Sequence, residues 1–287
     1  MQEEYEFRIP YEYAHLLFEP DEGELLGGDD MYAPSIQKIT ISPEDPRFKK
    51  IGMVFEEMRA KNNKSFYLGW NIRRKYTQDE LSSAEVFSLK ITARFEPAGE
   101  ECGTKYDKSS GCRVCRGWEK QTTDLILNCK KIPKSREICS TIADEYLVSE
   151  RLANVLKTER ITGLELHQVR DSVTNGNCKW YQLVLKPTAN LTTETIFGDK
   201  PFSADPETMI RCSIGGPGHV LGLNLLSEVF VKRSTWTGED ISCTYELRGW
   251  NQGLLRTRPI ILITPRLRSL LLREKVKKFE TNVAYLR

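Results

Sequence analysis

The sequence predicts an α+β fold, with an N-terminal α+β domain followed by two tandem, related strand-helix-strand modules. Three observations predict it. Alternating apolar stretches, typical of strands, are interspersed with apolar residues at helical spacing. One stretch of the chain recurs at an offset of 115 residues, and a Cys-x-x-Cys turn opens its first copy. The predicted domains are residues 1–97, 98–200 and 201–287, and the first break is placed at Pro97.

The N-terminal domain begins with aromatic and acidic residues in alternation, which indicates a strand through about Tyr11. A second strand is expected at Ile36–Ile41. Pro46 then opens a helix that Asn62 and Asn63 end. We expect a further strand over residues 65–72, with the bases of residues 73–75 in a solvated turn or touching phosphate. A short helix through Ala84 and a strand over residues 86–95 complete the domain.

The repeat relates Leu147–Leu166 to Leu262–Thr281. Ser149 and Thr264 are expected to be the N-caps of corresponding helices. The helices carry matching apolar stripes, and a strand is predicted on each side of each helix. At the offset of 115, identical residues include Arg151, Leu152, Leu156, Glu159 and Glu165, which match Arg266, Leu267, Leu271, Glu274 and Glu280.

The similarity extends upstream of the helices in a shifted register. Residues 137–141, Glu-Ile-Cys-Ser-Thr, match residues 240–244, Asp-Ile-Ser-Cys-Thr. Strands are expected before each, at residues 124–127 and 227–231. Still further upstream, the Cys112-x-x-Cys115 turn corresponds roughly to residues 212–216, which retain Cys212.

The charges are unevenly distributed, although the net charge is only +2. Residues 1–30 contain ten acids and one base, and residues 254–287 contain nine bases and two acids. Such ends can bind a basic protein and nucleic acid, respectively. They can equally be solvated faces or lie against one another.

No apolar run is long enough to span a membrane, and the first residues lack the order of a signal peptide. We therefore expect a cytoplasmic protein without membrane contact. Its eight cysteines should then be reduced thiols or metal ligands rather than disulfides.

The cysteines near residue 112 predict a structural zinc site, since a Cys-x-x-Cys turn presents two thiolates to one tetrahedral ion. The predicted ligands are Cys102, Cys112, Cys115 and Cys212, with Cys129 and His219 as alternatives for the fourth position. The second module has Gly215 where a partner for Cys212 would be expected. A metal-free, partly decayed turn is therefore the other interpretation.

Catalysis is not predicted. The Cys-x-x-Cys pair does not open a helix in a thioredoxin-like context, which disfavours a redox role. The three histidines stand apart from any nucleophile at a motif spacing. The expectation is a protein that is not an enzyme, without catalytic or organic-cofactor residues.

Several of these motifs together resemble bacterial double-CXXCG motif proteins over roughly residues 99–287. The resemblance lies in Gly99–Tyr106, the Cys112-x-x-Cys115 turn with Gly117, Val148–Leu152, Thr162–Leu166 and Arg258–Leu267. Members of that family are assigned as immunity proteins against polymorphic toxins. This chain departs from the motif where Arg116 interrupts Cys-x-x-Cys-Gly and where the second turn has lost a cysteine.

The resemblance implies a protein that neutralises a cognate bacterial toxin by direct binding. A second hypothesis is a zinc-knuckle protein that binds nucleic acid through the basic C-terminal module. A third is a phage-encoded inhibitor of a bacterial defence complex. The sequence leaves the oligomeric state open.

Overall fold

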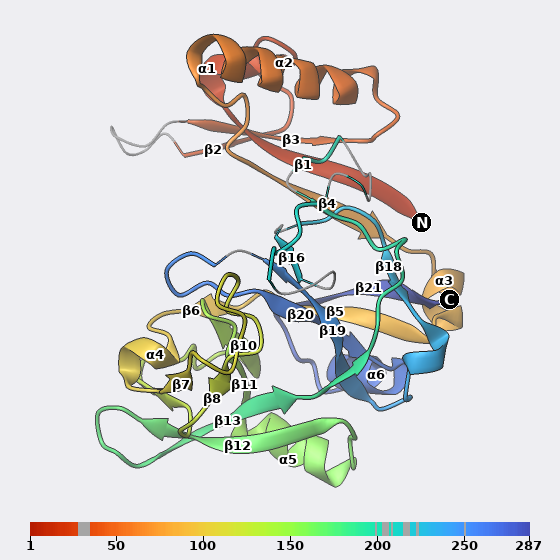
Figure 1. The fold of residues 1–287 in the computed structure, drawn as a ribbon. Coiled ribbons are helices and arrows are strands. Elements are labelled where there is room, and N and C mark those ends of the chain that lie inside the picture. Colours follow the sequence, from red (N-terminus) through yellow and green to blue (C-terminus); the bar gives the residue numbers. More distant parts are fainter. Residues whose placement is uncertain are drawn as a thin grey trace. The chain divides into compact units, whose positions relative to one another are not determined.

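A computed structural model describes residues 1–27, 35–198, 200–202, 207, 209–214, 219–221, 224–249 and 251–287. The chain forms two compact units (Figure 1). The first comprises Met1–Leu81 with Lys200–Ser203, and the second comprises Ser82–Asp199 with Ala204–Arg287. Within the described residues, no helix has the length and apolar character needed to cross a membrane.

The first unit is an antiparallel sheet with one long helix, α2 (Pro46–Asn62), as predicted. The side chain of Asp45 accepts from the N–H of Arg47 and caps α2. The apolar stripe of α2 packs on β1, where the rings of Tyr5 and Phe48 are 4.5 Å apart. The sheet order is β2 (Glu24–Leu26), β3 (Ile36–Ile41), β1 (Gln2–Pro10), β4 (Gly69–Lys75), and the short helices are α1 (Tyr11–Ala14) and α3 (Gln78–Ser83).

The N-terminal acids of β1 are neutralised within this unit by the bases of β4. The predicted turn at residues 73–75 is wrong, because these residues continue β4 beside β1. The ion pairs are Arg74 with Glu3 at 2.8 Å, Lys75 with Glu4 at 2.6 Å and Arg73 with Glu6 at 2.6 Å. Opposite charges on neighbouring strands stabilise the pairing, which accounts for these bases without a phosphate.

The second unit contains two larger sheets, each with one helix of the repeat. The first has the order β6 (Arg94–Phe95), β10 (Ile138–Thr141), β11 (Tyr146–Ser149), β13 (Asn177–Leu185), β12 (Leu164–Asp171), β9 (Ile126–Leu127). The second has the order β14 (Pro187–Ala189), β19 (Ile241–Gly249), β20 (Arg258–Ile263), β5 (Val86–Ile91), β21 (Phe279–Leu286), β18 (Val229–Val231), and β16 (His219–Leu221) also pairs with β19.

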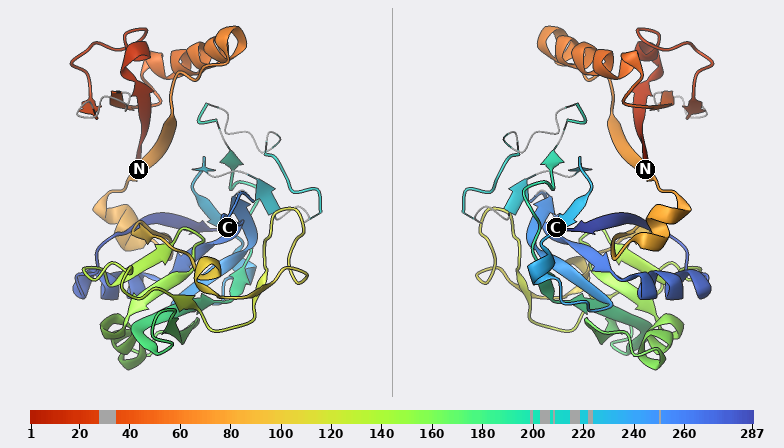
Figure 2. Two further views of the ribbon diagram at one scale, coloured as in Figure 1. Left: turned by 90° about the vertical axis from the view of Figure 1, so that its left-hand side faces the viewer. Right: turned by 90° about the vertical axis from the view of Figure 1, so that its right-hand side faces the viewer.

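Smaller elements complete the second unit. They are α4 (Gly99–Cys102), the pair β7 (Tyr106–Asp107) and β8 (Lys120–Gln121), the pair β15 (Phe197–Gly198) and β17 (Asn224–Leu225), and the 3-10 turn η2 (Arg233–Thr235). The repeat helices are α5 (Glu150–Thr158) and α6 (Pro265–Arg273). Figure 2 shows α5 and α6 on one side of this unit and the loop between residues 100 and 120 on the other.

The two sheets have corresponding strand orders, with matching parallel and antiparallel pairings. The repeat offset also fits the register. Leu147 faces Gln182 in the first sheet, and Leu262, 115 residues later, faces Ser88 in the second. On the other side of these strands, His167 faces Gln182, and its counterpart Asn282 faces Ser88. The predicted strand-helix-strand repeat is therefore present in both copies.

The strands β5 and β13 occupy corresponding places in the two sheets but come from different positions along the chain relative to their copies. Strand β13 follows β12 along the chain and completes the first sheet, while its counterpart β5 precedes the first copy and completes the second sheet. Pairing of β5 with β20 and β21, and of β6 with β10, places residues 86–95 in the second unit. The structure therefore divides the chain at Leu81, ahead of the predicted break at Pro97, and keeps both modules in one unit.

The helix caps of the repeat are equivalent. The Ser149 hydroxyl accepts from the N–H of Leu152 at 3.1 Å, and the Thr264 hydroxyl accepts from the N–H of Leu267 at 3.4 Å. Each cap hydroxyl also donates to the carboxylate that begins the upstream five-residue match, which is Glu137 for Ser149 and Asp240 for Thr264. Such caps each contribute about 1 kcal/mol.

Contacts between α5 and α6 are reciprocal. Arg151 donates to the Glu274 carboxylate at 2.8 Å. Its counterpart Arg266 donates to the backbone carbonyl of Glu159, the counterpart of Glu274. The two copies therefore meet through the same positions, as the halves of a symmetric dimer do.

Cys129 and Cys178 are paired as a disulfide with Cα atoms 6.1 Å apart. The expectation of eight reduced or metal-bound cysteines is wrong for this pair. Cys178 lies on β13 and Cys129 follows β9, and both belong to the apolar cluster of the first sheet. Only the folded sheet brings these two positions together.

Candidate metal centre

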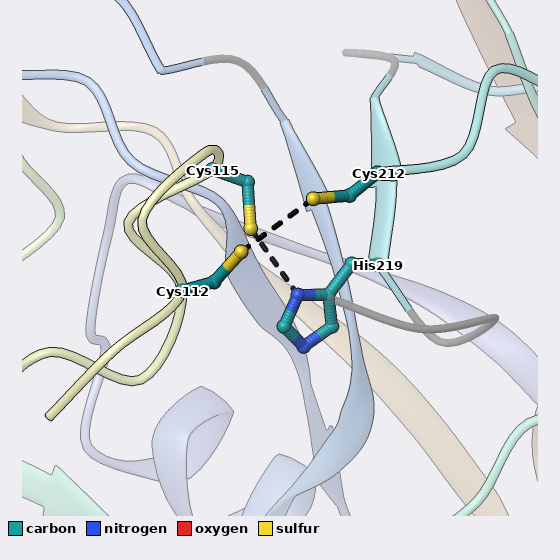
Figure 3. Close-up of side chains that lie close together, drawn as sticks. All are labelled: Cys112, Cys115, Cys212 and His219. Carbon is teal, nitrogen blue, oxygen red and sulfur yellow. Dashed lines mark hydrogen bonds between the residues drawn. The ribbon is translucent and has the colours of Figure 1, made fainter. Parts of the chain in front are cut away.

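Four side chains from the two copies converge at one point in the second unit (Figure 3). They are Cys112 and Cys115 from the turn in the first copy, and Cys212 and His219 from the second. Their potential ligand atoms all lie within 4.8 Å of one another. The Cys112 and Cys212 sulfurs are 3.5 Å apart, and the Cys115 sulfur is 3.2 Å from Nδ1 of His219.

This donor set fits a metal ion. Three thiols and an imidazole form a Cys₃His set, in which ligands about 2.3 Å from a tetrahedral ion lie roughly 3.8 Å from each other. The observed separations are close to this value. Because all four positions are filled by protein atoms, such a centre has the closed coordination of a structural site.

The first knuckle, residues 112–117, is a tight turn closed by backbone hydrogen bonds. Cys112 N–H donates to the Gly117 carbonyl at 3.0 Å, and Arg116 N–H donates to the Cys112 carbonyl at 2.8 Å. A Cβ on Gly117 would come within 2.3 Å of Leu247 and 2.8 Å of Thr257, so only glycine fits here. The turn is therefore built to lie directly against the second copy.

Residues of the second copy hold this knuckle from outside. The Thr257 N–H and hydroxyl donate to the Cys115 carbonyl at 3.3 and 3.1 Å. The Asn251 amide donates to the Val114 carbonyl at 2.7 Å. Fixing the ligands through such outer contacts is common around metal sites.

Arg116, which interrupts the Cys-x-x-Cys-Gly motif, adopts a left-handed conformation with φ of 56°. That conformation favours glycine, which explains the motif residue that Arg116 replaces. Its guanidinium donates to Glu119 at 2.8 and 2.9 Å and to Glu100 at 3.3 Å. Arg256 of the second copy also pairs with Glu100. Glu100 thus joins Arg116 of the first copy to Arg256 of the second through ion pairs.

The second half of the site is a pair of strand segments. Cys212 N–H donates to the His219 carbonyl at 2.8 Å, and Arg211 forms a bridge with Val220. Strand β16 in turn runs beside β19. This pairing places the side chains of Cys212 and His219 together, although six residues separate them in the sequence. Gly215, the expected partner position, lies outside the described residues.

Burial sets the protonation of the ligands before any metal binds. It raises the pKa of Cys115 to about 11 and lowers the pKa of His219. For Cys112, burial opposes the thiolate, but the backbone N–H groups of Cys115 and Val114 outweigh it and lower the pKa. The neutral imidazole and the Cys112 thiolate are the forms that bind metal, while Cys115 would release a proton on binding.

The structure brings together three of the four predicted ligands and adds His219, the alternative considered for the fourth position. Cys102 lies outside the group, at the last residue of α4, and Cys129 is in the disulfide. From the sequence, His219 is predicted only as an alternative ligand, because its spacing from Cys212 forms no recognised ligand motif.

Comparison with known proteins adds no family: no protein-family model matches the chain, and no curated protein matches it.

Proposed function

We propose that this chain is a non-enzymatic protein that neutralises a toxin by binding it, and that zinc in the Cys₃His centre holds the two copies of its repeat in one scaffold. The observation that carries the proposal is the origin of the ligands, two from each copy. A closed four-ligand centre favours a structural ion over a catalytic one, and thiolate and imidazole donors favour zinc.

The ion pairs of the C-terminal arginines support a protein partner rather than nucleic acid. Most arginines among the C-terminal bases are paired with acids of the same unit. The pairs are Arg256 with Glu100, Arg258 with Asp144, Arg266 with Asp240, Arg273 with Glu159 and Arg287 with Glu194. A basic surface that binds nucleic acid needs cations available to phosphate. The pairing therefore disfavours the nucleic-acid hypothesis, and the motif resemblance supports a toxin as the target.

Co-expression in a bacterial host tests this function. The chain is produced with the product of the gene next to its own, and growth, complex formation and zinc content are measured. We expect protection from a toxic product and co-elution of the two proteins. Cys212→Ser should weaken both. A neighbouring product that is harmless, or that remains toxic and unbound beside the zinc-loaded chain, contradicts the proposal.

Separate outcomes distinguish the remaining hypotheses. Binding to a 20-nucleotide single strand that falls steeply with salt would favour nucleic acid. Binding to a component of a defence complex instead of a toxin would favour the phage-inhibitor reading.

A further inference from the structure

Large apolar side chains are exposed on the loops that carry the metal ligands. Val114 is 37% exposed, Trp118 40%, Ile210 53% and Ile214 64%. Each lies within three residues of a ligand cysteine. The ligand atoms themselves lie within 4.8 Å of one another, so these four residues belong to chain segments that meet at one centre. We call them the knuckle-tip surface.

The two copies contribute corresponding residues to this surface. Val114 is the second residue after Cys112, and Ile214 is the second residue after Cys212. These two apolar residues do not serve the core, since both side chains are exposed. Apolar groups clustered on a surface in this way are typical of binding sites.

Trp118 is held in an unfavourable backbone conformation. Its φ is 61°, a region that bulky residues rarely adopt. Gly117, immediately before it, is wedged against Leu247 and Thr257 of the second copy. Strained residues that the surrounding structure fixes are concentrated at functional sites. Fixing an exposed indole also removes entropy that would otherwise be lost on binding.

The charged groups around this surface are mostly basic. Lys105, Lys108, Arg113, Lys120 and Arg211 are exposed. Two acids on the same loop are paired with bases: the Glu119 side chain is only 4% exposed and pairs with Arg116, while Glu100 pairs with Arg116, Arg256 and, at 3.4 Å, Lys108. The carboxylate of the exposed Glu101 accepts from the Ala98 N–H, and that of Asp107 accepts from the Ser109 N–H and hydroxyl.

We propose that the knuckle-tip surface binds the partner protein, and that the partner offers an apolar patch bordered by carboxylates. This inference rests on the proposed function and names the surface that performs it. Three of the four apolar groups are aliphatic. Aliphatic side chains fill pockets in a protein, whereas single-stranded bases are held by stacking on aromatic rings and guanidinium groups. The basic border complements carboxylates and accelerates encounter with them.

Site-specific crosslinking in the source cell tests the surface. Val114→p-benzoylphenylalanine is placed on the full chain, with Val173→p-benzoylphenylalanine as control, because Val173 is 57% exposed on the turn between β12 and β13. We expect a crosslinked protein only from position 114. That protein is then purified and its binding to the zinc-loaded chain is measured.

The double variant Val114→Asp/Ile214→Asp should raise the Kd at least about tenfold, or roughly 1.4 kcal/mol, with zinc content unchanged. Val173→Asp should leave the Kd unchanged, and Arg113→Glu should weaken binding most at low salt.

Three results would contradict binding of the partner protein by the knuckle-tip surface. They are no protein crosslink from position 114, a crosslink that nuclease removes, or a partner that binds the double variant as tightly as the parent chain. If a toxin partner binds the double variant and the parent chain equally, the proposal of toxin neutralisation stands and the proposed binding surface is wrong. If the crosslinked partner is not a toxin but its binding depends on Val114 and Ile214, the proposed surface stands and the toxin assignment is wrong.

Discussion

The sulfur atoms of Cys112 and Cys212 lie 3.5 Å apart, although Cys212 follows Cys112 by 100 positions in the chain. Each cysteine belongs to a different copy of the repeat. Together with Cys115 and His219 they join the copies, and the reciprocal contacts of α5 and α6 join them at a second place. The second unit is thus fastened at two places, one ionic and one suited to a metal.

Substituting the ligands should abolish metal binding selectively. Cys212→Ser and His219→Ala each remove one donor and should leave the purified chain with little zinc. Cys102→Ser is the matched control, since Cys102 lies outside the group, and it should retain one equivalent. Elemental analysis checks both. Zinc lost from the Cys102 variant but kept by the Cys212 variant would refute the ligand assignment.

Metal removal should loosen the second unit and spare the first. The ligands bind metal together only in the folded state, so the binding free energy adds to folding stability. Chelation should therefore increase amide hydrogen exchange in β16, in β19 and around Thr257. Helix α2 in the first unit serves as the internal control and should exchange at an unchanged rate. Uniform changes in both units would contradict this expectation.

Gly163 should tolerate no side chain. Its φ is 86°, and an added Cβ would meet the Ile241 carbonyl oxygen at 1.8 Å. Gly253 also has a positive φ, of 59°, but its Cβ would meet nothing within 4 Å. Gly253→Ala should cost about 1 kcal/mol through backbone strain alone, and Gly163→Ala at least about 2 kcal/mol more. Urea unfolding measures both, and equal losses would argue against the close contact of Gly163 with β19.

The carboxylates around Arg47 should make the first unit sensitive to acid. Hydrogen bonding to Arg47 lowers the pKa of Asp45 and Glu22 below their ordinary values. A depressed folded-state pKa stabilises the protein above the unfolded pKa, near pH 4, and this contribution is lost as the pH falls through the folded value.

Arg47→Gln should therefore raise both pKa values, as followed by carboxyl carbon NMR shifts. Its destabilisation relative to the parent chain should be largest above about pH 4 and shrink below it. Lys49→Gln removes a neighbouring exposed charge and is the control. A loss of stability that does not vary with pH would show that Arg47 acts through packing on Phe18 instead.

Local signals in the sequence predicted the elements of the repeat well. Ser149 and Thr264 cap the helices as expected, because a hydroxyl before an apolar stripe is a local pattern. The joining of β5 to the sheet of the second copy was not predicted. Residues 86–91 alternate like any strand, and only distant partners, Leu262 and Asn282 among them, determine which sheet they join.

The metal centre was predicted only in part, because contacts between distant residues also determine which side chains meet there. Cys112 and Cys115 form a local motif, and the repeat pointed to Cys212. Cys102 was favoured by its nearness in sequence to the knuckle, yet it ends a separate short helix. His219 reaches the site through the pairing of its strand segment with Cys212. Without the register of that pairing, a lone histidine carries no recognisable motif.

X-ray absorption at the zinc edge tests the central claim most directly, because it counts the ligands around the ion. The purified full chain should hold one zinc with three sulfurs at about 2.3 Å and one nitrogen at about 2.0 Å. Two sulfurs with two nitrogens or oxygens, or a chain that binds no zinc when refolded with it, would contradict a centre shared by the two copies.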